Sequence, residues 1–191
     1  MENKFRLLKP SEISCRVNQI GEKGLTLLLY KDARVDMDIL DETVGAMNWQ
    51  RDHKELKGNI YCGVSIFDKD LDHWVTKWDC GAESNTEAEK GESSDSFKRA
   101  CTNWGIGREL YTSPFIYIPT DKTKQSKDLD VVEVYKNDKG KWATKDTFTV
   151  EAIKYNEQRE ITHLSIKNKA NKRVFLLKPK EVKKNENNKQ T

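Results

Sequence analysis

Three segments of strand length follow one another between residues 49 and 80, with only short polar turns between them. They span residues 49–56, 59–67 and 74–80. The first turn is Lys57-Gly58 and the second is the polar stretch 68–73. Strands joined by short turns of this composition pair as antiparallel neighbours. The sequence therefore predicts a three-stranded antiparallel meander.

A helix is expected directly after the meander, within residues 86–110. At roughly 100° per residue, Phe97, Cys101 and Trp104 fall in one narrow sector, and this stripe should pack on the sheet. Lys98 and Arg99 then point away from the stripe, toward solvent or a ligand. Gly91 predicts a break in the helix near residue 91.

Further elements are expected on both sides. Residues 11–17 should form a short helix that ends near Arg16, residues 25–30 an interior strand, and residues 33–45 a helix that ends at Gly45. Beyond residue 130, strands are expected at 131–135, 147–155, 161–168 and 173–177. The predicted fold class is α+β: an antiparallel β-meander packed on a long helix, with a small C-terminal β appendage. We expect a core at residues 1–120, the appendage at 131–178 and a disordered basic tail at 179–191.

Composition narrows the function classes. No apolar run approaches the roughly 20 residues of a membrane span, and the N-terminal segment lacks the apolar stretch of a secretory signal, so we expect a cytoplasmic protein. The last fourteen residues hold five Lys and two Glu, which equals the formal net charge of +3 for the whole chain. Residues 1–177 are therefore neutral in sum, and a DNA site on them requires local clustering of charge. The four cysteines stand singly, which predicts reduced and mostly packed thiols.

An ordered series of short motifs runs through residues 7–118. It comprises Leu8-Lys9-Pro10 with Ser14-Cys15-Arg16, then Tyr30-Lys31-Asp32-Ala33-Arg34-Val35, Leu40-Asp41-Glu42-Thr43-Val44-Gly45 with Trp49, and the stretch from Lys90 through Asp95 to Lys98-Arg99-Ala100. In this order the chain resembles the single-strand annealing proteins related to the eukaryotic recombination mediator Rad-fifty-two, particularly their phage and prophage relatives. The resemblance implies a β-β-β-α core and ATP-independent binding and annealing of single-stranded DNA in recombination and double-strand break repair.

The same resemblance implies a homo-oligomeric ring or filament with a basic groove for single-stranded DNA, and other recombination proteins are further candidate partners. No enzymatic activity, cofactor or metal is expected. In the family the Lys-Arg pair of the long helix, the Arg after the first helix and the aromatic residue at the end of the first strand line the groove. A further basic residue of the eukaryotic protein corresponds here to Thr102. The candidate DNA-binding residues are Arg16, Tyr30, Arg34, Lys90, Lys98, Arg99 and Arg108.

Other interpretations of these residues stay open at this point. Lys98 and Arg99 also fit a solvated helix face, and the tryptophans fit core positions as well as base-stacking platforms. Two sets of aspartates could be magnesium ligands of a nuclease. They are Asp32, Asp36 and Asp38, and Asp68, Asp70 and Asp72. An Asp-rich turn and a helix N-terminus explain them without a metal. A third class is a phage protein that inhibits a host system by binding a host protein.

Overall fold

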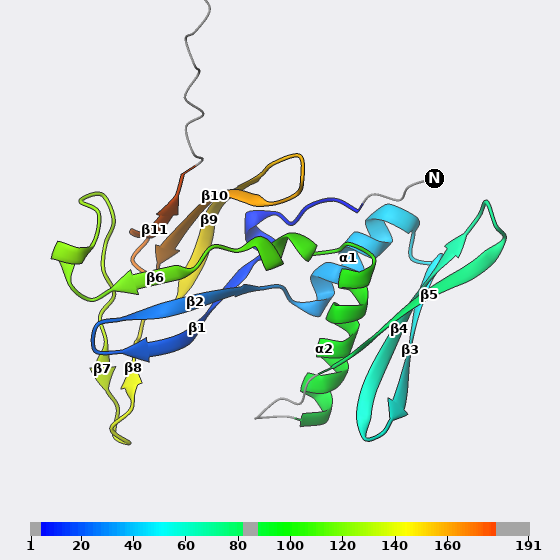
Figure 1. Ribbon diagram of the computed structural model, residues 1–191, viewed down its shortest axis with the longest axis horizontal. Coiled ribbons are helices and arrows are strands. Elements are labelled where there is room, and N and C mark those ends of the chain that lie inside the picture. The colour runs from blue at the N-terminus through cyan, green and yellow to red at the C-terminus, as the bar shows by residue number, and fades with distance from the viewer. Residues whose placement is uncertain (1–4, 82–87, 179–191) are drawn as a thin grey trace, which may run out of the picture.

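A computed structural model describes residues 5–81 and 88–178, with residues 88–90 described by their backbone alone. Figure 1 shows two sheets at opposite ends of the molecule, with the helices α1 and α2 between them. The elements of the first half are η1 (Pro10–Glu12), β1 (Ser14–Gly21), β2 (Gly24–Tyr30), α1 (Ala33–Val44), β3 (Trp49–Leu56), β4 (Asn59–Asp68), β5 (His73–Cys80) and α2 (Ala88–Asn103). The second half holds η2 (Arg108–Thr112), β6 (Ile116–Pro119), η3 (Lys122–Lys124), β7 (Tyr135–Lys136), β8 (Trp142–Ala143), β9 (Phe148–Tyr155), β10 (Ile161–Asn168) and β11 (Arg173–Leu177).

The larger of these sheets has six strands in the order β11-β10-β9-β1-β2-β6, and the smaller has three in the order β3-β4-β5. Strands β7 and β8 pair as a separate two-stranded antiparallel hairpin. The strand pairs of both sheets are antiparallel. The mixed α and β class with antiparallel sheets is therefore as predicted, and the strands and turns of the meander match the prediction to within a residue. Among the described residues, no helix is both long and apolar enough to cross a bilayer.

Helix α2 lies against the smaller sheet through its apolar stripe. Phe97 is fully buried and its ring stacks on Trp49 with the centroids 6.2 Å apart. The Nε1 of Trp104 donates to the carbonyl of Val64 at 2.9 Å. Because these contacts fix the rotation of the helix, Lys98 and Arg99 lie beside the buried stripe, with side chains 29% and 48% exposed.

Three local predictions are wrong. Residues 11–17 do not form a helix: η1 ends at Glu12 and β1 begins at Ser14, because β1 pairs with the leucine-rich β2 across the Gly21–Gly24 turn. Helix α2 continues through Gly91 without a break, and the carboxylate of Glu92 holds it to the sheet by accepting the Ile60 N–H at 2.7 Å.

The third error concerns residues 131–135, where only Tyr135 lies in a strand. Val132 is 1% exposed, and its N–H donates to the carbonyl of Pro119 at 3.1 Å. The apolar character of Val132 therefore reflects its packing beside β6 and not a position in a paired β-strand.

The C-terminal strands β9, β10 and β11 extend the sheet that β1 and β2 begin, with Ser14 of β1 opposite Thr149 of β9. The carbonyl of Leu8 also accepts the hydroxyl of Tyr155 at 3.0 Å. The predicted appendage is thus packed on the N-terminal part of the chain. Its separation from residues 1–120 as a functional unit stays a prediction.

Candidate nucleic-acid interface

The end of β2 brings an aromatic residue to the surface and a lysine to the interior. Tyr30, the last residue of the strand, is 42% exposed, whereas Lys31 is buried. Asp32 then caps α1 by accepting the Arg34 N–H at 2.9 Å, which turns the chain from strand into helix. This junction places Tyr30 and Lys31 beside α2.

A groove of about 310 Å³ opens at this junction. Its lining comes from three segments distant in sequence: Tyr30 and Lys31 after β2, Asp95, Lys98, Arg99 and Thr102 of α2, and Gly107 and Tyr111 of the segment that contains η2. Of the predicted DNA-binding residues, the groove brings Tyr30, Lys98 and Arg99 together. Its aromatic side chains are exposed, Tyr111 by 73%.

A buried ion pair lies beneath the groove. The Nζ of Lys31 donates to both carboxylate oxygens of Asp36, at 2.5 and 2.6 Å, and the two side chains are 6% and 0% exposed. Burial raises the pKa of Asp36 to about 6, although Lys31, Lys98 and Cys101 all act to lower it. Gly107 leaves room for the lysine, since a Cβ there would stand 2.1 Å from Cε of Lys31.

Each basic side chain at the groove is paired with an aspartate. Lys98 lies 3.9 Å from Asp95, and the Nε of Arg99 donates to Asp79 of β5 at 3.2 Å. The bond to Asp79 is the main cause that raises the pKa of Arg99 above its usual value. Any anion that binds at the groove would therefore compete with these carboxylates for the cations.

Arg16 of β1 belongs to the same exposed sheet face as Tyr30. In the β1–β2 register Ser14 stands opposite Tyr30, and Arg16 opposite Leu28. Residues two apart on a strand share a face, so Arg16 and Tyr30 are diagonal neighbours. Arg16, Leu28 and Tyr30 are all exposed. The surface beside the groove therefore continues along β1 with one basic and one apolar side chain beyond Tyr30.

The remaining predicted residues lie elsewhere. Arg34 is 85% exposed beside Asp32 at 3.0 Å, outside the groove lining. Arg108 donates to the carbonyls of Thr102 and Asn103, which closes the C-terminus of α2, and it lines a different hollow of about 850 Å³. The side chain of Lys90 lies outside the described residues.

Two groove residues were not identified from the sequence. Lys31 stands in the quoted motif, but its burial depends on Asp36 and on the Gly107 turn, which local patterns do not reveal. Tyr111 lies in η2, which is too short to give a helical periodicity in the sequence. The exposure of Tyr111 marks it as a surface residue, and the sequence gives no sign of this exposure.

The acidic clusters have structural roles. In the turn after β4, Asp68 accepts the N–H groups of Asp70 and Leu71 at 2.9 and 3.2 Å, an Asx turn. Asp32 caps α1 and Asp36 binds Lys31. Within the described parts of the chain, no three His, Cys, Asp or Glu side chains gather closely enough to hold a metal ion.

The thiols match their prediction. All four cysteines are free, two of them fully buried. Burial raises the pKa of Cys15 to about 12 and that of Cys62 to about 11, so these thiols stay protonated near neutral pH.

Comparison with known proteins agrees with the motifs. None of the curated proteins matches the chain. The model of the family described as Rad52/22 family double-strand break repair protein matches residues 5–129. This range contains the groove and more than half of the chain. The chain therefore belongs to the Rad52/22 family of double-strand break repair proteins.

Proposed function

We propose that this protein binds single-stranded DNA in the groove of Tyr30, Lys98 and Arg99 and anneals complementary strands without ATP. The observation that carries the proposal is the convergence of these three side chains, from segments almost 70 residues apart, in one surface groove. Membership of a double-strand break repair family supports a role in recombination. The protein acts as a homo-oligomer inside the cell and is not an enzyme.

The chemistry of the groove suits annealing. Lys and Arg hold the phosphate backbone irrespective of sequence, and stacking on Tyr30 and Tyr111 is equally tolerant, since every base has a π face. Base edges then stay exposed for pairing with a second strand. In this proposal β3, β4, β5 and α2 form the β-β-β-α annealing core. The resemblance to phage and prophage members supports a phage or prophage origin.

The groove is tested by the double variant Lys98→Ala plus Arg99→Ala in an oligonucleotide annealing assay, without ATP and in excess chelator. We expect annealing to slow by about tenfold or more, because a hydrogen bond to a charged group contributes roughly 1.5–3 kcal/mol. A nuclease would stop working in chelator, whereas annealing should continue.

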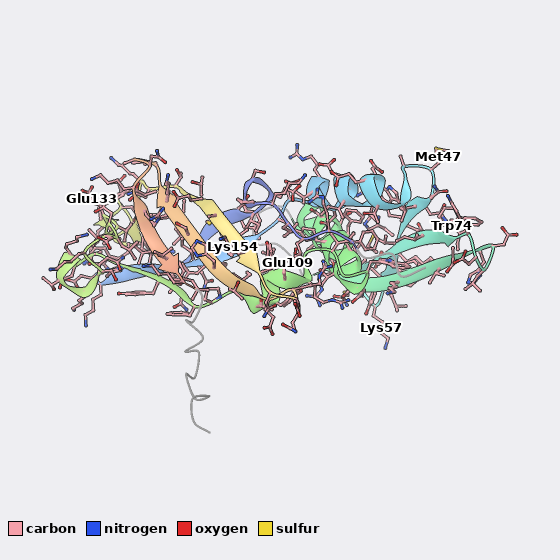
Figure 2. The ribbon with its side chains drawn as sticks, turned by 90° about the horizontal axis from the view of Figure 1, so that it is seen from above. Met47, Lys57, Trp74, Glu109, Glu133 and Lys154 are labelled. Atoms are coloured by element: carbon pink, nitrogen blue, oxygen red, sulfur yellow. The ribbon has the colours of Figure 1, made fainter. Side chains whose placement is uncertain are left out.

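The matched control is Lys69→Ala plus Lys154→Ala, which removes the same charge from exposed positions outside the groove. Figure 2 shows Lys154 on the six-stranded sheet, outside the meander and α2. The control should anneal like the native protein. A native protein that neither binds nor anneals DNA would contradict the proposal and favour a protein-binding inhibitor.

Asp79→Asn should tighten DNA binding. The change removes the charge that pairs with Arg99 but keeps an oxygen able to accept the Cys80 N–H, now bonded at 2.8 Å. Since exposed ion pairs contribute roughly 0.2–1 kcal/mol, the affinity should rise by up to about fivefold at low salt. Fluorescence anisotropy of a labelled oligonucleotide measures it, with the exposed Asp128→Asn as control. Equal affinities for the two variants would show that Asp79 does not compete with phosphate.

A further inference from the structure

The hairpin of β7 and β8 carries a concentration of positive charge. Residues 135–145 contain four lysines and a single acidic residue, Asp138. The lysines are all exposed: Lys136, Lys139, Lys141 and Lys145. This hairpin lies outside residues 5–129, the range that the family model matches.

Two aromatic rings lie among these lysines. The Nζ of Lys136 lies 5.3 Å from the ring centroid of Trp142, and the Nζ of Lys145 lies 5.7 Å from that of Tyr135. Tyr135 is 42% exposed. Trp142 is partly buried. Lysines beside accessible aromatic rings are the side-chain types that hold a single strand, with cations on phosphates and rings under bases.

Hydrogen bonds fix the conformation of the hairpin tip. The carbonyl of Asn137 accepts the Gly140 N–H at 2.8 Å, and its side-chain oxygen accepts the N–H groups of Lys139 and Lys141 at 3.1 and 3.0 Å. At the base, Thr144 donates to the carbonyl of Glu133 at 2.8 Å. Because Lys139 and Lys141 take part in these bonds only through their backbone N–H groups, their ammonium groups are available without cost to the turn.

The hairpin adjoins strand β1, which carries the continuation of the groove. Strand β8 lies beside β1, the strand of Arg16. Leu25 and Leu27 face the core, whereas Leu28 and Tyr30 are about 40% exposed on the opposite face. In Figure 1 the hairpin and α2 project to the same side of the β1–β2 pair, one near each end.

We infer that the β7–β8 hairpin is an additional binding site for single-stranded DNA, which takes the strand after it leaves the groove and crosses the exposed face of β1 and β2. This inference rests on the proposed function. Strand β1 has eight residues and spans about 23 Å at roughly 3.3 Å per residue. At the stacked spacing of about 3.4 Å per phosphate that one strand has in B-form DNA, this length corresponds to roughly seven phosphates.

The test is the dependence of affinity on oligonucleotide length for Lys139→Ala plus Lys141→Ala. Two probes are compared, oligothymidylates of about 6 and about 30 nucleotides, because only the longer one can exceed the roughly seven phosphates between the sites. For the longer probe, the slope of log affinity against log salt should become shallower by about 1.4, which corresponds to about 25-fold weaker binding at about 0.1 M salt. Affinity for the shorter probe should stay within about twofold of the native value.

The control variant Lys69→Ala plus Lys154→Ala separates local contacts from the overall field of the protein. It should bind both probes like the native chain. The inference is overturned if the hairpin variant loses less than about threefold of its affinity for the long probe. It is also overturned if the hairpin and control variants lose affinity equally. In both cases binding by the native protein leaves the groove proposal standing. If the native protein binds neither probe, the proposed function fails and the inference falls with it.

Discussion

Replacing Lys31 with Met should lower the free energy of unfolding by about 3–5 kcal/mol, the typical cost of removing one partner of a buried ion pair. Asp36 would keep its place at 0% exposure and lose both hydrogen bonds from Nζ. Urea unfolding of the native and variant chains at neutral pH measures the difference.

The pH dependence of this variant identifies its cause. Lys31 acts to lower the pKa of Asp36, which burial already raises to about 6 from an ordinary 3.8. Without Lys31 the folded-state pKa should rise further above the unfolded value. The folded state then binds the proton more tightly, so stability is lost as pH rises through the folded pKa and is regained on acidification. Lys31→Met should therefore recover part of its lost stability between pH of about 7 and about 5.

The matched control removes the carboxylate as well. Lys31→Met plus Asp36→Leu leaves no buried charge, and apolar replacement of buried ion pairs is often neutral or stabilising. The double variant should recover most of the stability and show no recovery on acidification. A double variant as unstable as the single one would show that lost packing, and not the unpaired carboxylate, explains the effect.

Much of the fold follows from local signals. The Lys57-Gly58 turn has positive φ at both residues, 54° and 77°, as a two-residue hairpin of type I′ requires. Helix α1 begins after the capping Asp32 and ends before Gly45, whose φ is 88°. These elements were predictable because the residues that determine them lie within a few positions of each element.

Residues 14–21 show where local patterns fail. Ile13 and Val17 are four apart, which suggests a helix face, but the alternation of Ser14, Cys15, Arg16 and Val17 suits a strand equally well. The hairpin partner decides: Cys15 stands opposite Leu29 and Val17 opposite Leu27. The join between β1 and β9 depends on residues about 135 positions apart and has no local signal.

The candidate site also combines features that local sequence predicts with features that it does not. The helical period alone directs Lys98 and Arg99 away from Phe97, and the strand end exposes Tyr30. The pairing of Arg99 with Asp79 depends on how α2 lies across β5, and the burial of Lys31 depends on the turn at Gly107. The direction of a side chain was therefore predictable from its own element, whereas its partners were not.

Gly107→Ala should destabilise the protein by about 3 kcal/mol, because two costs add at this position. Its φ of 69° is a left-handed conformation that costs an L-residue roughly 1–2 kcal/mol. The new Cβ would also stand 2.1 Å from Cε of Lys31. Overpacking a buried site typically costs about 1–3 kcal/mol. The lysine cannot move aside cheaply, since its Nζ is bonded to both oxygens of Asp36.

Gly140→Ala is the matched control for Gly107→Ala. Gly140 has the same φ of 69°, but a Cβ there meets nothing within 4 Å. Both variants bear the backbone cost, so the difference between their unfolding free energies isolates the overlap with Lys31. We expect the two unfolding free energies to differ by about 1–3 kcal/mol. Gly107→Ala alone should also bind short oligonucleotides more weakly, because Lys31 forms the floor of the groove. Equal destabilisation by the two substitutions would mean that the Lys31–Asp36 pair yields to the new methyl group, and that the buried ion pair does not hold the shape of the proposed DNA groove.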